Sequence, residues 1–149
     1  MVIKLRRILL VEDNPNDAEL TREALAEHNL ANSVDWVKDG EEALDYLYGR
    51  GGYADHAAGD LAVVLLDLKL PKVDGLEVLR TLKGDADLRF IPVVVLTSSR
   101  EEQDMIESYR LGVNAYVVKP VNFHDFTDAV KELGAFWAIV NEPPPGKCR

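Results

Sequence analysis

The sequence has little cysteine, few basic residues and no long apolar run. Cys148 is the only cysteine among 149 residues, so an internal disulfide is excluded and a reducing compartment is favoured. Lysine and arginine number 17 against 26 acidic residues, and the formal net charge is -9. This balance argues against nucleic-acid partners and against binding to an anionic membrane. No apolar stretch approaches the roughly 20 residues of a membrane-spanning helix, so we expect a cytoplasmic protein.

The composition that remains is that of a globular protein. Hydrophobic residues make up 47% of the chain and charged residues 29%, which is enough apolar surface to bury a core. The length fits one domain. We expect that domain to span 6–140, including an extended last helix, and to be followed by a C-terminal tail over 141–149, where a run of prolines ends regular structure.

Short apolar runs alternate with amphipathic stretches along the chain. The runs predict strands over 7–11, 33–37, 61–66, 91–96 and 115–118. The stretches predict a helix after each strand. The first helix starts at Pro15 with Leu20 and Leu25 on its apolar stripe, the fourth is capped by Ser98 or Ser99, and the last covers 122–140. Five such alternations predict an α/β fold whose parallel sheet carries helices on both faces.

The third predicted strand delivers one carboxylate. Residues 61–66 are all apolar, which is typical of a strand buried on both faces, and Asp67 follows directly. Pro71 prevents the strand from continuing, and Asp74–Gly75 starts the next helix. Open α/β sheets bind ligands at the carboxyl ends of their strands, so Asp67 is the first candidate for chemistry.

Polar residues also follow three other predicted strands. Glu12 and Asp13 follow the first strand, Thr97 the fourth and Lys119 the fifth. Three neighbouring carboxylates repel one another, and a bound Mg²⁺ removes the repulsion because it takes oxygen ligands. A lysine and a hydroxyl can hold phosphoryl oxygens. This collection suits transfer of a phosphoryl group to a carboxylate.

The motifs Glu12-Asp13, Asp67 with Pro71 and Gly75, Thr97-Ser98 and Lys119-Pro120 occur in the order found in one family. Over about 6–133 the chain resembles the receiver domain of two-component response regulators.

The resemblance implies a flavodoxin-like (βα)5 fold with strand order 2-1-3-4-5. It implies that Asp67 accepts a phosphoryl group from a kinase phosphohistidine, assisted by Thr97 and Lys119, and that the protein catalyses only its own phosphorylation and dephosphorylation. It also implies the following Mg²⁺ ligands: Glu12 directly or through water, Asp13, Asp67 and the backbone carbonyl of Lys69. Thr97 and Tyr116 would form the switch pair.

Two features point to one group within that family. The loop over 49–60 is long, and the C-terminal extension is rich in aromatic residues. Both are similar to single-domain regulators that partner phytochrome-type histidine kinases, so the expected donor is such a sensor kinase and the output is altered protein contacts. The alternative is an intermediate in a phosphorelay that passes its phosphoryl group to a histidine phosphotransfer protein.

The predicted last helix favours a homodimer. Its apolar residues step by four and three, as in a helix-packing seam, and spread beyond one core-facing stripe. The expected dimer-interface residues are Phe126, Val130, Leu133, Phe136, Trp137 and Val140. The alternative is that they only fill the core of their own domain.

Three other functions compete with a phosphoacceptor. A haloacid dehalogenase-type phosphatase needs an acid two residues after its nucleophile, where this chain has Lys69. An FMN carrier needs a hydroxyl-rich loop after the first strand, where this chain is acidic. A scaffold that had lost phosphotransfer is disfavoured because all four chemical positions are occupied. We further expect Lys69 to change the lifetime of the phosphorylated state, without a predicted direction.

Overall fold

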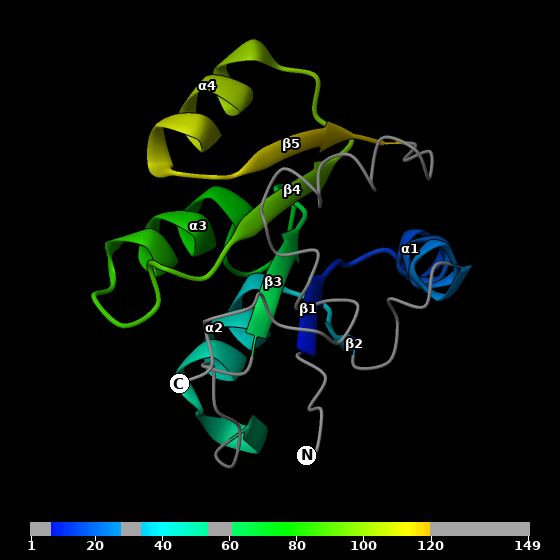
Figure 1. Cartoon of the computed structure of the whole chain (residues 1–149), viewed down its shortest axis with the longest axis horizontal. Helices are drawn as coiled ribbons and strands as arrows, with labels where there is room; N and C mark the ends of the chain where they lie inside the picture. Colours follow the sequence, from blue (N-terminus) through cyan, green and yellow to red (C-terminus); the bar gives the residue numbers. More distant parts are fainter. Residues whose placement is uncertain (1–6, 28–33, 54–60, 120–149) are drawn as a thin grey trace, which may run out of the picture.

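The fold is a five-stranded parallel sheet covered by helices. The computed structural model describes residues 7–27, 34–53 and 61–119. Figure 1 shows the strands side by side in the order β2-β1-β3-β4-β5, as predicted from the resemblance. The elements are, in chain order, β1 (Arg7–Val11), α1 (Pro15–Glu27), β2 (Val34–Val37), α2 (Gly40–Tyr48), η1 (Gly51–Tyr53), β3 (Leu61–Leu66), α3 (Gly75–Gly84), β4 (Val93–Thr97), α4 (Glu102–Leu111) and β5 (Ala115–Val118).

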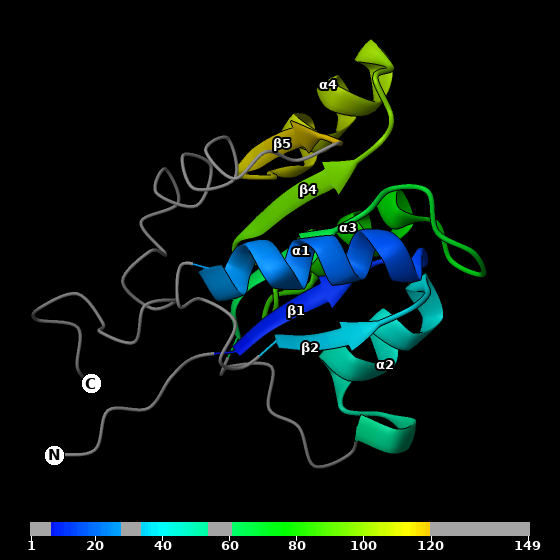
Figure 2. The same ribbon diagram turned by 90° about the vertical axis from the view of Figure 1, so that its right-hand side faces the viewer.

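The sheet separates two apolar cores. Side chains alternate across a strand, so in β3 Val63 and Leu65 face one core while Val64 and Leu66 face the other. The first core is covered by α1 through Ala18, and Figure 2 shows α1 lying across the sheet. The second core is covered by α2 and α3. All six residues of β3 are buried, which confirms the central strand predicted from its unbroken apolar run.

Glycine at position 75 lets α3 start directly against the end of β3. A Cβ atom at Gly75 would lie 2.3 Å from the carbonyl oxygen of Asp67 and 2.5 Å from the Cα of Leu68. The Gly75 N–H donates to the Leu68 carbonyl at 2.9 Å. The segment that carries Asp67 is therefore packed tightly against the first turn of a helix, and the close approach excludes any larger residue without movement of the backbone.

Three local predictions are wrong. Leu20 is 63% exposed, because α1 faces the sheet with Ala18 and Leu25, seven residues apart, and Leu20 lies well around the helix from both. Neither Ser98 nor Ser99 caps α4, whose N-cap is Glu101 and has no side-chain hydrogen bond. The fourth strand covers 93–97 rather than 91–96, since the strand starts only after Pro92.

Several expectations fall on residues that the structure does not describe. These are the last helix over 122–140, the tail over 141–149 and the proposed dimer-interface residues Phe126, Val130, Leu133, Phe136, Trp137 and Val140. Within the described ranges, no helix has the length and apolar character needed to cross a membrane.

Candidate functional site

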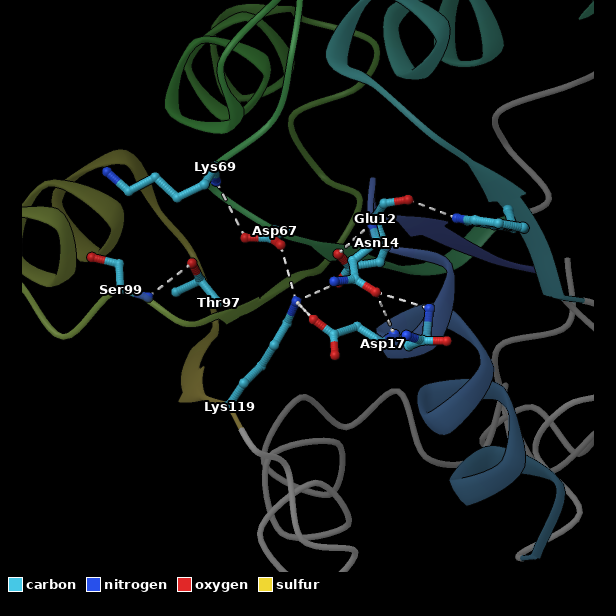
Figure 3. Close-up of polar contacts among 10 residues, drawn as sticks. Glu12, Asn14, Asp17, Asp67, Lys69, Thr97, Ser99 and Lys119 are labelled. Carbon is cyan, nitrogen blue, oxygen red and sulfur yellow. Dashed lines mark hydrogen bonds and ion pairs between the residues drawn. The ribbon is translucent and has the colours of Figure 1, made fainter.

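The predicted site residues are positioned by hydrogen bonds that extend the sheet one residue past its strands. The Glu12 N–H donates to the Val37 carbonyl at 3.1 Å, the Asp67 N–H to the Val11 carbonyl at 3.1 Å and the Lys119 N–H to the Thr97 carbonyl at 2.9 Å. The carboxyl ends of β1, β3, β4 and β5 thus stay in register, and their side chains meet at one edge of the sheet (Figure 3).

The ammonium of Lys119 lies at the centre of this edge. It donates to Glu12 Oε1 at 2.5 Å, to Asp17 Oδ2 at 3.0 Å and to Asp67 Oδ2 at 3.0 Å (Figure 3). The Lys119 side chain is only 13% exposed. Burial lowers the pKa of Lys119, but the hydrogen bonds to the three carboxylates more than offset burial, so the pKa lies above its ordinary value. Lys119 is a fixed positive charge beside Asp67.

Glu12 is a buried carboxyl group held from three directions. It is 2% exposed, and besides Lys119 its Oε2 accepts the Asn14 N–H at 3.1 Å. The Trp36 indole N–H donates to the Glu12 backbone carbonyl at 2.7 Å. Burial raises the pKa of Glu12 to about 7, although the hydrogen bonds from Lys119 and Asn14 act in the opposite direction. Glu12 therefore binds a proton far more readily than an exposed glutamate.

Glu12, Asp13 and Asp67 can converge on one cation. Each can place a carboxylate oxygen within 4.8 Å of the others, and Asp13 is exposed whereas Glu12 and Asp67 are buried. A few carboxylate oxygens open to water on one side are the donor set that Mg²⁺ takes in phosphoryl-transfer sites. The residues present thus fit a divalent cation. That the Lys69 backbone carbonyl adds a further ligand stays a prediction.

On the other side of Asp67 the polar contacts are mostly hydroxyl groups. Thr97 is fully buried, and its Oγ1 accepts the Ser99 N–H at 3.2 Å. The Tyr116 hydroxyl donates to the Ser99 carbonyl at 3.2 Å. The two members of the predicted switch pair, Thr97 and Tyr116, thus both contact Ser99, which is part of the segment between β4 and α4.

Lys69 makes two contacts that point in different directions. Its backbone N–H donates to Asp67 Oδ1 at 3.2 Å. Its side chain extends away from Asp67 (Figure 3) and lies 3.6 Å from Asp104 Oδ2 in α4. Asp104 Oδ2 also accepts the Ser99 hydroxyl at 2.6 Å. The backbone of Lys69 therefore positions Asp67, while its amine contacts α4.

Sequence reasoning missed Asp17, Ser99 and Asp104 as parts of this site. For the segment that contains Asp17 the sequence predicts only a helix that starts at Pro15, and for Ser98 or Ser99 it predicts only a helix cap. The available signal for Asp17 was its place in the first turn of a helix that directly follows Glu12 and Asp13, which brings it to the same sheet edge. Asp104 gave no comparable signal, because its contact depends on how α4 packs.

The match to known sequences fixes the class of this protein. Residues 8–131 match the response regulator receiver domain, and the fold and strand order agree with that match. The chain belongs to the response regulator receiver domain family, in which phosphorylation of an aspartate is the family property.

Within the family, the chain is similar to regulators that are named for phytochromes. It is 65% identical to the bacteriophytochrome response regulator AtBRR, with 93% of this chain and 99% of that chain covered and a TM-score of 0.82. It is 57% identical to the bacteriophytochrome response regulator RtBRR, with 96% and 86% covered and a TM-score of 0.83.

A third relative carries a metal in its solved structure. The chain is 42% identical over 130 residues to the response regulator Rcp1 of Synechocystis sp. (strain ATCC 27184 / PCC 6803 / Kazusa), with 87% of each covered. A solved Rcp1 structure is the Mn²⁺-bound form; it is 40% identical, covers 93% of this chain and 99% of that chain, and has a TM-score of 0.77.

Proposed function

We propose that this protein is a cytoplasmic response regulator that accepts a phosphoryl group on Asp67 from the phosphohistidine of a phytochrome-type sensor histidine kinase. One observation carries the proposal: Asp67, 5% exposed at the end of a fully buried strand, belongs to an acidic group suited to a cation and accepts a hydrogen bond from the Lys119 ammonium. The similarity to two bacteriophytochrome response regulators supports the choice of kinase.

This edge of the sheet supplies the nucleophile and the hydrogen-bond donors for the transfer step, and the cation assigned below completes the site. A carboxylate oxygen of Asp67 attacks the phosphorus, an O–P bond forms, and the P–N bond breaks with its electron pair going to the imidazole nitrogen of the kinase. The Lys69 N–H holds Oδ1 of Asp67 in place. Lys119 donates to a phosphoryl oxygen in the same way as it now donates to Asp67. The protein acts on its own carboxylate, so it is a phosphoacceptor rather than an enzyme with a separate substrate.

Mg²⁺ is the cation we assign to the acidic group. Glu12, Asp13 and Asp67 would hold it, with the Lys69 carbonyl as a further ligand, and the Mn²⁺-bound form of Rcp1 supports a divalent cation at such a site. When bound, it neutralises charge on the phosphoryl oxygens. The contribution of the chain is to hold two buried carboxylates and one exposed carboxylate close together before binding.

The output of phosphorylation is a change in protein contacts through Thr97 and Tyr116. A phosphoryl group on Asp67 offers new acceptor oxygens to the Thr97 hydroxyl, which now accepts the Ser99 N–H. Movement of Thr97 changes the segment to which Tyr116 is hydrogen-bonded through the Ser99 carbonyl. Both contacts lead to the surface formed by β5 and α4, where partner binding would be altered.

Phosphotransfer from a labelled kinase tests this function. A phytochrome-type histidine kinase and an unrelated histidine kinase are autophosphorylated with radiolabelled ATP and mixed with the purified protein and Mg²⁺. We expect rapid transfer from the phytochrome-type kinase, no transfer to Asp67→Asn, and normal transfer to the control Asp87→Asn, which changes an exposed aspartate elsewhere. Equal labelling of Asp67→Asn, or faster transfer from the unrelated kinase, would contradict the proposal.

We also propose that the protein is a homodimer. The support is the spacing of Phe126, Val130, Leu133, Trp137 and Val140 in the sequence, by four and three residues. Light scattering coupled to size-exclusion chromatography should give the dimer mass at micromolar concentration. A monomer mass with and without phosphorylation would rule this out.

A further inference from the structure

The Lys119 ammonium has as many carboxylate partners as it has N–H groups. It contacts Glu12, Asp17 and Asp67, each from a different element. For Lys119 to donate to a phosphoryl oxygen, at least one of these three hydrogen bonds must be given up. The position of the Lys119 ammonium during the reaction therefore depends on which carboxylate remains hydrogen-bonded to it.

Two of the three partners belong to the acidic group that fits a cation. Among the described residues this group comprises Glu12, Asp13 and Asp67, and Asp17 lies outside it. A carboxylate oxygen that binds a cation is a weaker acceptor for an ammonium, because the two positive charges repel each other at that oxygen. A cation held by Glu12 and Asp67 would weaken their hydrogen bonds to Lys119, whereas Asp17, outside the group, would keep its own.

Asp17 is also held in a fixed place relative to the site. It lies in the first turn of α1, where the Asn14 side-chain oxygen accepts the N–H groups of Asn16 at 2.8 Å and Asp17 at 3.1 Å. The Asn14 N–H in turn donates to Glu12 Oε2 at 3.1 Å. These bonds connect the helix start to the site, as Figure 3 shows.

We propose that Asp17 is a positioning residue that keeps the Lys119 ammonium oriented towards the phosphoryl group while the cation occupies Glu12 and Asp67. This inference rests on the proposed function. Without Asp17, the Lys119 side chain would have no carboxylate partner left in the loaded site and would be conformationally free. Binding of a phosphoryl oxygen would then cost the conformational entropy of this four-carbon side chain.

Binding of beryllofluoride, a stable mimic of a phosphoryl group, tests the inference in the whole protein. Affinity is measured by calorimetry at saturating Mg²⁺ for the wild type, Asp17→Ala, Asp17→Asn and the control Glu19→Ala, which removes an exposed charge from the same helix. We expect Asp17→Ala to bind about fivefold more weakly, since one half-exposed ion pair is lost. Asp17→Asn, which keeps an acceptor oxygen, should lose less, and Glu19→Ala should match the wild type.

The same measurement in a Lys119→Met background separates positioning from a structural role. There the Asp17→Ala change should have no further effect on beryllofluoride affinity, because the side-chain partner of Asp17 among the described residues is Lys119. Unchanged or tighter binding by Asp17→Ala, an equal loss in Glu19→Ala, or an undiminished effect in the Lys119→Met background would each overturn the inference. If the wild type itself fails to bind beryllofluoride, or Asp67→Asn binds it equally well, the proposed function fails instead.

Discussion

Asp67 lies between two flanks whose residues are joined by different kinds of contact (Figure 3). The charged flank consists of Glu12, Asp17 and Lys119, whose groups form ion pairs across the ends of β1 and β5. The hydroxyl flank consists of Thr97, Ser99 and Tyr116, which are joined by neutral hydrogen bonds. Each flank contains at least one buried residue, Glu12 in the first and Thr97 and Ser99 in the second, and the main difference between the flanks is one of charge.

Under the proposed function, this difference would separate binding from signalling. A buried ion pair resists rearrangement because an unpaired charge is costly in the protein interior. The charged flank therefore rearranges only when a new charge, such as a cation or a phosphoryl group, enters the site. A hydroxyl group can redirect its hydrogen without exposing or burying a charge. The hydroxyl flank is therefore suited to moving the segment between β4 and α4, and the charged flank to holding metal and phosphoryl group.

The largest expected effect is a difference in stability between variants of the two lysines near Asp67, Lys119 and Lys69. Lys119→Met leaves three carboxylates without their cation and should lower the free energy of unfolding of the metal-free protein by roughly 3 kcal/mol. Lys69→Met should lower it by less than about 0.5 kcal/mol, because the Lys69 side chain is 57% exposed and makes one long ion pair. Urea unfolding in EDTA measures both values.

Addition of Mg²⁺ should affect the two lysine variants differently. The cation supplies the positive charge that Lys119→Met lacks, so Mg²⁺ should stabilise this variant more than the wild type. The urea midpoint of Lys119→Met should therefore rise more on addition of Mg²⁺ than that of the wild type. Equal losses of stability in the two lysine variants would remove the distinction between the flanks.

A smaller effect on the charged flank depends on pH. The pKa of Glu12 is raised from 4.5 to about 7 in the folded protein, so folding favours the protonated form. The stability gained from this proton is fully present below pH 4.5 and is lost as the pH rises through 7. From about pH 5 to about pH 8, the metal-free wild type should lose about 2 kcal/mol relative to Glu12→Gln, which has no proton to release. If the stability of the two proteins changed in parallel with pH, the pKa of Glu12 would not be raised in the folded protein.

On the hydroxyl flank the expected effect is smaller still. Thr97→Val keeps the shape of the side chain but removes the acceptor for the Ser99 N–H. This should lower the free energy of unfolding by about 1 kcal/mol. Amide hydrogen exchange at Ser99 should become faster in Thr97→Val and remain slow in Thr97→Ser, which keeps the hydroxyl. Unchanged exchange in the valine variant would show that Thr97 does not hold this segment.

The smallest expected effect concerns Lys69 and Asp104. Because the Lys69 amine faces Asp104 rather than Asp67, any influence on the lifetime of the phosphorylated state should pass through Asp104. Lys69→Ala and Asp104→Ala should change the dephosphorylation rate in the same direction, and the double variant should equal the larger single effect. Loss of label over time gives the rates. An unchanged rate in Lys69→Ala, or additive effects, would remove this role.

Most of the fold could be predicted from the sequence because its signals are local. The unbroken apolar run of 61–66 and the alternation of strands and helices lead directly to a parallel sheet, and the resemblance supplied its strand order. The errors at Leu20 and Ser99 have one cause. Which face of α1 meets the sheet, and which residue begins α4, depend on packing that the local pattern does not contain.

The site was only partly predictable for a related reason. Glu12, Asp67 and Lys119 each directly follow a strand, so strand order alone brings them together. Asp17 and Asp104 reach the site from helices, and their contacts depend on the exact position of α1 and α4. The direction of the Lys69 side chain also depends on tertiary packing. The sequence pattern predicts where the Lys69 backbone lies after the strand, but not where its amine points.

Intact mass spectrometry after incubation with a small phosphodonor tests the central claim most directly. Wild type, Asp67→Asn and Asp87→Asn are incubated with acetyl phosphate, with Mg²⁺ or with EDTA. We expect wild type and Asp87→Asn each to gain one phosphoryl group with Mg²⁺ and almost none with EDTA, and Asp67→Asn to gain none. Failure of the wild type to gain mass, or equal gain by Asp67→Asn, would contradict the assignment of Asp67 as the phosphoacceptor.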